Sequence, residues 1–339
     1  MANAASGLTV RRYDDPADDP RLLQLLEEAF GGWPAGGAAD AAAHLRWKLH
    51  SRPEAARSHV VAEIDGRIVG AVFYLVQEVK VGDRLLHARQ GIDACISPGY
   101  RKRGVMAEIR RFSWELDVGS FDLQFGPTGH RAVIRLDDRE GAARFAEHVD
   151  VLRHPLERSS PADDAQPGAG ERPGWTIRVA SRFDERIDEF WTEASQPFDF
   201  IVVRTKDYLN WRYCDARAGT FTILLAEQDD RILGYAAVCV RRGTGRIADL
   251  LALPDRSDIA RSLIGAAVDH LRAAGASSVE CWTTKHHAYR GLLKRGGFTV
   301  RQRSTRLTYG PMREPAATFE FLDRPGAAVH FLAGDSDLV

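Results

Sequence analysis

A short basic turn is the segment of this sequence whose residue types are best suited to hold an anion. An apolar stretch ends at residues 96–98, and Gly104 precedes a helical pattern. Three basic residues lie between them: Arg101, Lys102 and Arg103. Backbone N–H groups at a helix start have no partner within the helix and can bind an anion, and arginine fits two phosphate oxygens at once. The turn therefore predicts binding of a pyrophosphate, with a solvated basic surface turn as the alternative.

The cysteines do not have the spacing of metal ligands. They are far apart in the sequence: Cys95, Cys214, Cys239 and Cys281. Metal sites and disulfide frameworks show short, regular cysteine spacings. We therefore expect reduced, structural cysteines and no metal, with a reactive thiol as the alternative.

Two blocks of the sequence repeat with the same offset. Residues 44–48 align without a gap to residues 208–212, and residues 62–70 align to residues 226–234. Trp47 and Trp211 are 164 residues apart, and so are Gly70 and Gly234. A repeat of this length indicates a duplicated domain and not a solenoid.

A linker is expected between the two copies. Residues 159–174 are rich in Pro, Gly, Ser and Asp and have no hydrophobic period, which is typical of a linker. We therefore predict a first domain over residues 1–158, a linker over 159–173 and a second domain over 174–339.

Both halves show the same order of expected elements. Helical patterns come first, then a strand, a tight turn and a second strand, then a strand–helix–strand segment and a last helix and strand. The expected strands include 58–64, 67–77, 87–97 and 121–125 in the first half and 220–227, 231–240, 246–253 and 278–283 in the second, with helices over 104–116 and 259–274. Antiparallel strands followed by a crossover indicate an α/β fold with a mixed sheet.

In this setting the basic turn resembles the signature of the GCN5-related N-acetyltransferase (GNAT) superfamily. That signature is Val-x-Pro-x-x-Arg-x-x-Gly-x-Gly/Ala. The positions that match it here are Ile96, Pro98, Arg101 and Gly104, whereas Met106 stands where Gly or Ala is usual. With both halves counted, the resemblance covers nearly the whole chain and implies two tandem GNAT-like acyl-CoA N-acyltransferase domains.

The resemblance implies acetyl-CoA as the co-substrate, with no metal. In the family the turn holds the pyrophosphate, and the pantetheine arm lies along the preceding strand between two splayed strands. Ile96 would contact pantetheine through its backbone. The residues implied to cradle the phosphates are Arg101, Lys102, Arg103, Gly104, Val105, Met106 and Ala107.

The resemblance also implies candidates for proton transfer. Asp93 lies on the cofactor-binding strand and would be the base or the anchor of the substrate amine, with a structural carboxylate as the alternative because Asp249 matches it in the second half. Gln90 stands where some relatives have a catalytic Glu, and a glutamine cannot be the base. His130 could donate a proton, with a capping or solvated histidine as the alternative. The usual tyrosine is not evident, so the general acid stays open.

The second half does not keep the phosphate turn. Ser257 replaces Arg101, Ala260 replaces Gly104, and acidic residues stand at 255 and 258. Negative charge there repels a pyrophosphate. We therefore expect that the first copy alone binds CoA and that the second is degenerate in this respect.

These observations predict an N-acetyltransferase that moves an acetyl group directly from acetyl-CoA to a primary amine of a small molecule. One alternative keeps the fold with another acyl-CoA or acyl donor, by aminoacyl transfer or thioester decarboxylation. The other is a non-catalytic tandem GNAT that senses CoA or binds a partner. The acceptor itself cannot be read from the sequence.

Composition narrows the class of protein. The 339 residues are 44% hydrophobic and 27% charged, with a formal net charge of -1, which is ordinary for a globular protein. The near-neutral charge argues against nucleic acid as a partner. The sequence has no run of 18 apolar residues, the length that a membrane-spanning helix needs. Residues 1–20 have no secretory pattern. We expect a cytoplasmic monomer or homodimer that acts on a small-molecule amine.

Overall fold

The computed structural model describes residues 7–13, 16–34, 40–51, 58–128, 133–135, 138, 143–156 and 174–336. The chain forms two compact units. Unit 1 comprises Met1–Phe145, Leu307–Arg324 and Ser336–Leu338, and unit 2 comprises Ala146–Arg306, Pro325–Asp335 and Val339. The compact units are therefore not identical to the duplicated halves, because residues 307–324 belong to unit 1 and residues 146–156 to unit 2. The expected linker at 159–173 lies outside the described residues.

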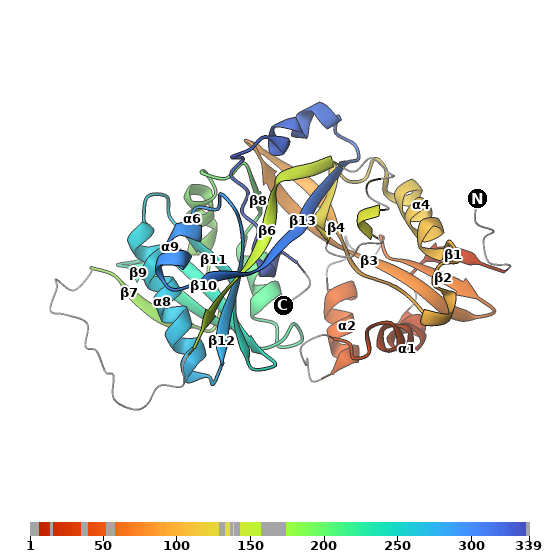
Figure 1. The fold of residues 1–339 in the computed structure, drawn as a ribbon, viewed down its shortest axis with the longest axis horizontal. Helices are drawn as coiled ribbons and strands as arrows, with labels where there is room; N and C mark the ends of the chain where they lie inside the picture. The colour runs from red at the N-terminus through yellow and green to blue at the C-terminus, as the bar shows by residue number, and fades with distance from the viewer. Residues whose placement is uncertain are drawn as a thin grey trace. The chain divides into compact units, whose positions relative to one another are not determined.

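Unit 1 is built on a mixed sheet (Figure 1). Its strands are β1 (Thr9–Arg12), β2 (Val60–Ile64), β3 (Arg67–Val81), β4 (Arg84–Ile96) and β5 (Leu123–Thr128), in that order across the sheet, followed by Leu307–Pro311 of β13 (Thr299–Pro311). The first four strands pair antiparallel, and β4 pairs parallel to β5. The turn between β2 and β3 contains Asp65 and Gly66, both at positive φ, as the Asp-Gly pair predicts.

Helices cover both faces of this sheet. The helices of unit 1 are α1 (Asp19–Phe30), α2 (Ala41–His50) and α4 (Val105–Asp117), with short 3-10 turns at Pro16–Asp18, Pro98–Tyr100 and Ala316–Asp323. Residues Ile68–Gln77 of β3 are all buried, and successive strand residues face opposite sides of a sheet. Both α1 and α4 contact β3, and Val105 and Ile109 of α4 pack on the core of β2 and β3.

Unit 2 repeats this plan. Its strand order is β7 (Thr176–Ala180), β9 (Thr222–Gln228), β10 (Arg231–Arg241), β11 (Thr244–Ala252), β12 (Ser278–Thr284) and residues 146–155 of β6 (Ala143–Pro155), beside which Thr299–Arg306 of β13 lies. β11 pairs parallel to β12, as β4 does to β5, and the other described strand pairs named here are antiparallel. The shared pattern of pairing agrees with a duplication.

The helices of unit 2 are α6 (Arg186–Ala194), α7 (Lys206–Tyr213), α8 (Ser257–Ala273) and α9 (Arg290–Arg295), with a short strand β8 (Phe200–Val202). Residues Ile232–Cys239 of β10 are all buried, and α6 and α8 both contact this strand. A tail of the chain, Pro325–Asp335, also belongs to unit 2 and ends in a 3-10 turn at Ala333–Asp335.

The mixed α/β sheet expected from the sequence is confirmed in both units, and each expected strand and central helix is present with shifts of a few residues at its ends. The main difference is the length of the β3–β4 hairpin. β3 and β4 stay paired out to Val81 and Arg84, whereas the sequence predicted strands over 67–77 and 87–97. Within the described part of the chain, no helix is long and apolar enough to cross a membrane.

Candidate active site

A cavity opens in unit 1 where two parallel strands separate. The parallel ladder between β4 and β5 runs from Ala88 opposite Leu123 to Gln90 opposite Phe125. Beyond that point a cavity of about 670 Å³ is lined by both strands and by α4, a size suited to a cofactor-sized ligand. The wall residues that the argument uses are Gly91, Ala94, Gly126, Pro127, Met106 and Ala107. This is the place at which the family resemblance puts pantetheine.

A β-bulge shapes β4 beside this cavity. Ala71 of β3 faces Cys95 and Phe73 faces Ile92, so the register shifts between them. Two residues, Asp93 and Ala94, therefore stand opposite one on β3. Asp93 has a φ of +44°, a conformation that aspartate tolerates better than most residues. A bulge leaves a residue outside the ladder and re-aims its neighbours, so it can direct a backbone N–H and a carboxylate toward a ligand.

Asp93 is paired with a lysine that the sequence analysis did not single out. Nζ of Lys48 on α2 lies 2.6 Å from Oδ2 of Asp93, and the two side chains are 4% and 11% exposed. The same ammonium lies 5.8 Å from the ring centroid of Trp33. The signal was present in the repeat, because Lys48 and Arg212 are both basic and both follow a matched tryptophan. The carboxylate of Asp93 is thus positioned by its ion pair with the ammonium of Lys48.

The basic turn lies at the start of α4, as expected. Gly104 is the residue before the helix and has a φ of +80°, and a Cβ added there would meet nothing within 4 Å. Glycine is therefore favoured by backbone conformation and not by lack of space. The three basic side chains of the turn, Arg101, Lys102 and Arg103, are exposed. The turn thus combines helix N–H groups with accessible positive charge.

The side chains of the turn have different roles. Nε of Arg101 donates to the Ile96 carbonyl at 3.2 Å, so its guanidinium folds back on the turn. The guanidinium of Arg103 lies 5.4 Å from the ring centroid of Tyr100. Val105 is 1% exposed and belongs to the core, which leaves only its backbone to meet a ligand. Met106 and Ala107 line the cavity, and Ile96 packs on the core behind it.

Three further candidates from the sequence remain. His130 lies outside the described residues. Gln90 is 1% exposed, and neither polar atom of its amide has a hydrogen-bond partner among the described residues. Burial raises the pKa of the Cys95 thiol to about 12, which keeps it protonated at neutral pH.

A buried ion pair lies beside the cavity, and the sequence did not predict it. Arg89 of β4 is 1% exposed. Its guanidinium pairs with Asp117 of α4, donates to the Ser113 hydroxyl at 3.1 Å, and lies 4.3 Å from the ring centroid of Tyr74. These contacts tie β4 to α4, the two elements that carry the bulge and the basic turn. The sequence around Arg89 does not indicate its partner, because Asp117 comes 28 residues later.

The counterpart of Asp93 in unit 2 is enclosed in an ionic network. Asp249 of β11 is 1% exposed. It accepts from Nη2 of Arg204 at 3.2 Å and from the Tyr235 hydroxyl at 2.7 Å, and Arg204 also donates to Asp335 of the tail at 2.6 Å. Burial by itself would raise the pKa of Asp249, but the charge of Arg204, together with His330 and the Tyr235 hydroxyl, outweighs burial and holds that pKa below its usual value. Burial raises the pKa of Asp335.

The strand edge that corresponds to the pantetheine edge is occupied in unit 2. Ala252 faces Gly234 on the neighbouring strand, as Ile96 faces Gly70 in unit 1. The N–H of Ala252 donates to the hydroxyl of Tyr289 at 2.9 Å, so a side chain of the same unit satisfies it.

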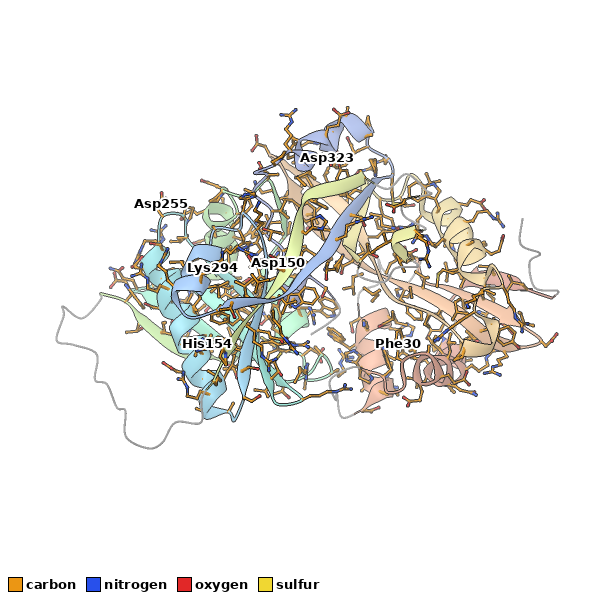
Figure 2. The ribbon with its side chains drawn as sticks, in the orientation of Figure 1. Phe30, Asp150, His154, Asp255, Lys294 and Asp323 are labelled. Atoms are coloured by element: carbon orange, nitrogen blue, oxygen red, sulfur yellow. The ribbon has the colours of Figure 1, made fainter. Side chains whose placement is uncertain are left out.

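The turn before α8 lacks the features of the basic turn. Asp255 is exposed in the loop before this helix (Figure 2). Arg256, which precedes the helix, pairs with Asp258 at 2.9 Å. The one arginine of this turn is thus neutralised by an acid of the same turn. Among the described residues of both units, no three His, Cys, Asp or Glu side chains are grouped so as to hold a metal ion.

Comparisons with known proteins agree with this fold. Residues 184–298 match the family model described as "Acetyltransferase (GNAT) family". The match falls in the second half of the chain, where the helix and strand pattern of the family is kept although the basic turn is not. No curated protein matches the chain in sequence.

Solved structures share the fold over most of the chain. A probable N-acyltransferase from Enterococcus faecalis V583 has a TM-score of 0.66 at 14% identity, over 92% of this chain and 74% of that one. N-myristoyltransferase from Saccharomyces cerevisiae, solved with bound myristoyl-CoA, has a TM-score of 0.61 at 12% identity, over 91% and 80%. A tandem GNAT protein from the clavulanic acid biosynthesis pathway has a TM-score of 0.60 at 15% identity, over 91% and 99%.

The family match and the two similar units define a tandem acyltransferase fold. The chain therefore has the fold of the GCN5-related N-acetyltransferase superfamily over most of its length, and residues 184–298 match the model of that family.

Proposed function

We propose that this protein is an N-acetyltransferase that moves an acetyl group from acetyl-CoA directly to a primary amine of a small molecule. The observation that carries the proposal is the cavity between β4 and β5 with the basic turn at its rim. The cavity suits the pantetheine arm, and the turn suits the pyrophosphate. The fold that the chain shares with GNAT proteins supports an acyl-CoA as the donor.

In this proposal the cofactor lies along β4 and ends at α4. The backbone of Ile96 contacts pantetheine. The phosphates are held by backbone N–H groups and side chains of the turn: Arg101, Lys102, Arg103, Gly104, Val105, Met106 and Ala107. Arg101 must release the Ile96 carbonyl to reach a phosphate, whereas Lys102 and Arg103 are already exposed.

Acyl transfer needs a deprotonated amine, a donor for the oxyanion and a proton for the leaving thiolate. Asp93 holds the ammonium of the acceptor and takes its proton, directly or through water. A backbone N–H of the bulge donates to the oxyanion, because the bulge frees it from the ladder. His130 stays the candidate for protonating the thiolate of CoA, with the general acid otherwise open.

Direct transfer is favoured over an acyl-cysteine intermediate. Cys95 is the cysteine of β4, two residues after Asp93. Its burial and its pKa of about 12 keep the thiol protonated and a poor nucleophile. The acetyl group therefore passes directly from CoA to the amine: the amine adds to the thioester carbonyl, the oxyanion collapses with loss of the carbon–sulfur bond, and the CoA thiolate takes a proton.

A longer acyl donor is the second candidate. Besides the strands, the lining includes Trp114, which lies ten residues along α4 from Gly104, and residues 309–311 of β13. An acyl chain longer than acetyl would find contacts there. A comparison of donors of different length separates the two.

We propose further that unit 2 binds no CoA. Its equivalent edge is bonded to Tyr289, and its turn carries acids in place of the basic cluster. The domain limits 1–158 and 174–339, with a linker between them, stay our assignment of the duplicated copies. A cytoplasmic location, where acetyl-CoA is available, and a monomeric or homodimeric state belong to the same proposal.

Release of free CoA tests the proposal. The chain is incubated with acetyl-, butyryl- or myristoyl-CoA and a panel of primary amines, and the new thiol is measured. We expect amine-dependent release that is greatest with acetyl-CoA. Release greatest with a longer acyl-CoA would replace the donor, and release without an amine would indicate hydrolysis of the thioester. Binding of acetyl-CoA with no release would favour a CoA sensor.

A further inference from the structure

The second half of the chain supplies one wall of the cavity in unit 1. Residues 308–311 line the cavity, and they belong to unit 1 although they lie in the second copy of the sequence. Tyr309 anchors this segment. The ring centroids of Tyr309 and Phe145 are 5.1 Å apart, and the Tyr309 hydroxyl donates to Oδ1 of Asp323 at 2.7 Å. Both partners also belong to unit 1, so the wall is held within that unit.

Two contacts with β5 place Gly310 in the sheet. Oγ1 of Thr308 donates to the carbonyl oxygen of Gly126 at 3.5 Å. The N–H of Met312 donates to the carbonyl oxygen of Asp122 at 3.0 Å. Because the later residue of one segment meets the earlier residue of the other, β13 runs antiparallel to its neighbour β5 here, and Gly310 lies midway between the two contacts.

Gly310 lies on the face of the sheet that bears the cavity. Met312 packs on the buried cluster that contains Val76, and Val76 pairs with Arg89 of the cavity wall. Residues two apart in a strand share a face, so Gly310 has the same face as Met312. Its place midway between the two contacts with β5 puts it beside Gln124, which also lines the cavity and pairs with Arg89.

Neither the backbone nor the packing requires a glycine at position 310. Its φ lies outside the left-handed region, and a Cβ added there would meet no described atom within 4 Å. At Gly70 of the same unit, by contrast, a Cβ would lie 2.6 Å from Cδ1 of Ile96. A glycine within a strand weakens the strand and often marks a place where a ligand comes close. Because Gly310 also lines the cavity, the space left by its missing side chain is part of the cavity.

This space lies at the end of the cavity away from the basic turn. The guanidinium of Arg89, in the same row across the sheet, donates to the hydroxyl of Ser113 on α4 at 3.1 Å. Ser113 comes nine residues after Gly104, which corresponds to about 14 Å along a helix. A CoA thioester carries its phosphates at one end of the pantetheine arm and its acyl group at the other. With the phosphates at the turn, the acyl end points toward Gly310.

We infer that Gly310, a residue of the second copy, sets the length of the acyl group that unit 1 accepts. The end of the acyl group occupies the space that Gly310 leaves open. The inference rests on the proposed function and deepens it, because it gives the second copy a part in the site of the first. A larger side chain at position 310 shortens the cavity from this end, so it acts on the acyl group and leaves the phosphates and the pantetheine arm in place.

Calorimetry with CoA and with acetyl-, butyryl- and octanoyl-CoA tests this in the full chain. Each affinity is expressed relative to that of CoA, which has no acyl group and so reports whether the turn and the arm still bind. We expect Gly310→Leu to weaken the longest acyl-CoA that the unchanged chain binds by about tenfold relative to CoA, while CoA itself binds within about threefold. Gly310→Ala should have a smaller effect in the same direction. The matched control is Gly265→Leu, at an exposed glycine of α8 whose added Cβ also meets no described atom within 4 Å, and it should leave every affinity unchanged.

The inference is wrong if the relative affinities are the same in Gly310→Leu and in the unchanged chain. It is also wrong if CoA and every acyl-CoA lose affinity equally, because the pantetheine arm would then lie at Gly310.

Release of CoA separates this outcome from that of the proposed function. If Gly310→Leu shortens the accepted acyl group but no amine stimulates CoA release, the inference holds and the transfer proposal fails. If amine-dependent release shows the same acyl preference in both chains, the transfer proposal holds and the inference fails. Failure of the unchanged chain to bind CoA or any acyl-CoA would overturn both.

Discussion

The hydroxyl of Tyr289 lies 2.9 Å from the backbone N–H of Ala252 and accepts its hydrogen bond. Ala252 is the counterpart of Ile96, because each faces a matched glycine on the neighbouring strand. A side chain of unit 2 thus satisfies this backbone N–H. This contact supports the proposal that unit 2 binds no CoA.

The contact predicts the effect of Tyr289→Phe. The variant leaves a buried N–H without its acceptor, which costs about 1–3 kcal/mol of unfolding free energy. Denaturant unfolding of unit 2 measures the loss. The number of acetyl-CoA molecules bound per chain should not change, because the acids at the turn remain. Unchanged stability would show that the Tyr289 hydroxyl is not needed at this edge.

Asp93→Asn tests the carboxylate beside Lys48. The amide keeps the shape but can neither take a proton nor hold an ammonium by charge, so we expect turnover to fall about 100-fold. Affinity for acetyl-CoA, measured by calorimetry, should stay within about twofold, because the phosphates are held at the turn. Asp83→Asn, at the exposed tip of the β3–β4 hairpin, is the matched control. Normal turnover in Asp93→Asn would remove Asp93 from the chemistry.

Arg204→Met tests the buried network of unit 2. The variant leaves Asp249 and Asp335 buried without their shared cation, which costs about 3–5 kcal/mol. Asp249 has a lowered pKa with Arg204 present. Without the cation, burial raises that pKa, so protonation should relieve part of the loss as the pH falls toward 4. Denaturant unfolding at pH 7 and pH 4.5 compares the two conditions, and an equal loss at both would contradict the account.

His59 gives unit 1 a defined pH dependence. The ring is fully buried, its Nδ1 accepts from the Tyr74 N–H at 3.2 Å, and burial lowers the pKa of His59 to about 4. The unfolded chain protonates near 6.5, so stability is complete above that pH and is lost as the pH falls from about 6.5 to about 4. A shift from 6.5 to about 4 corresponds to roughly 3 kcal/mol.

Unfolding of unit 1 between pH 7 and pH 4 measures this loss. In His59→Gln the part of the slope due to His59 should disappear. His87→Gln, at an exposed position of β4 in the same unit, should keep the slope. The assignment is wrong if His59→Gln and the unchanged chain lose stability equally over this range.

Cys95→Ala separates direct transfer from an acyl-enzyme route. Because the thiol is held protonated, its removal should change turnover by less than about threefold, apart from a modest packing loss in the fold. Loss of turnover with acetyl-CoA affinity intact would indicate a covalent role. Mass spectrometry of the intact chain after acetyl-CoA alone should show no acetyl adduct.

Much of the fold followed from the sequence because its signals are local. The Asp65–Gly66 turn, the alternating strands and the helix after Gly104 are each specified within a few residues. The offset between Trp47 and Trp211 then revealed the duplication. The exchange of residues 146–156 and 307–324 between the compact units did not follow, because strand pairing over such separations leaves no local signal.

The candidate site was predictable only in part, for the same reason. The turn from Arg101 to Ala107 is one continuous motif, and the structure places it at one helix start. Lys48 and Asp93 come from different elements, so their 2.6 Å contact required the fold. Arg89 likewise gave no indication of Asp117. The contact of the tail with α7 was also out of reach, because the Gly334 carbonyl, which accepts from Nε of Arg212, is a backbone group and gives no side-chain signal.

Calorimetric titration of acetyl-CoA into the full chain tests the central claim most directly. We predict one molecule bound per chain, an affinity at least 30-fold weaker in Arg103→Ala/Gly104→Pro (about 2 kcal/mol), and an unchanged affinity in Arg256→Ala, the matched change at the turn before α8. Two molecules per chain, or an intact affinity in the Arg103→Ala/Gly104→Pro variant, would contradict the assignment of a single cofactor site to the first copy.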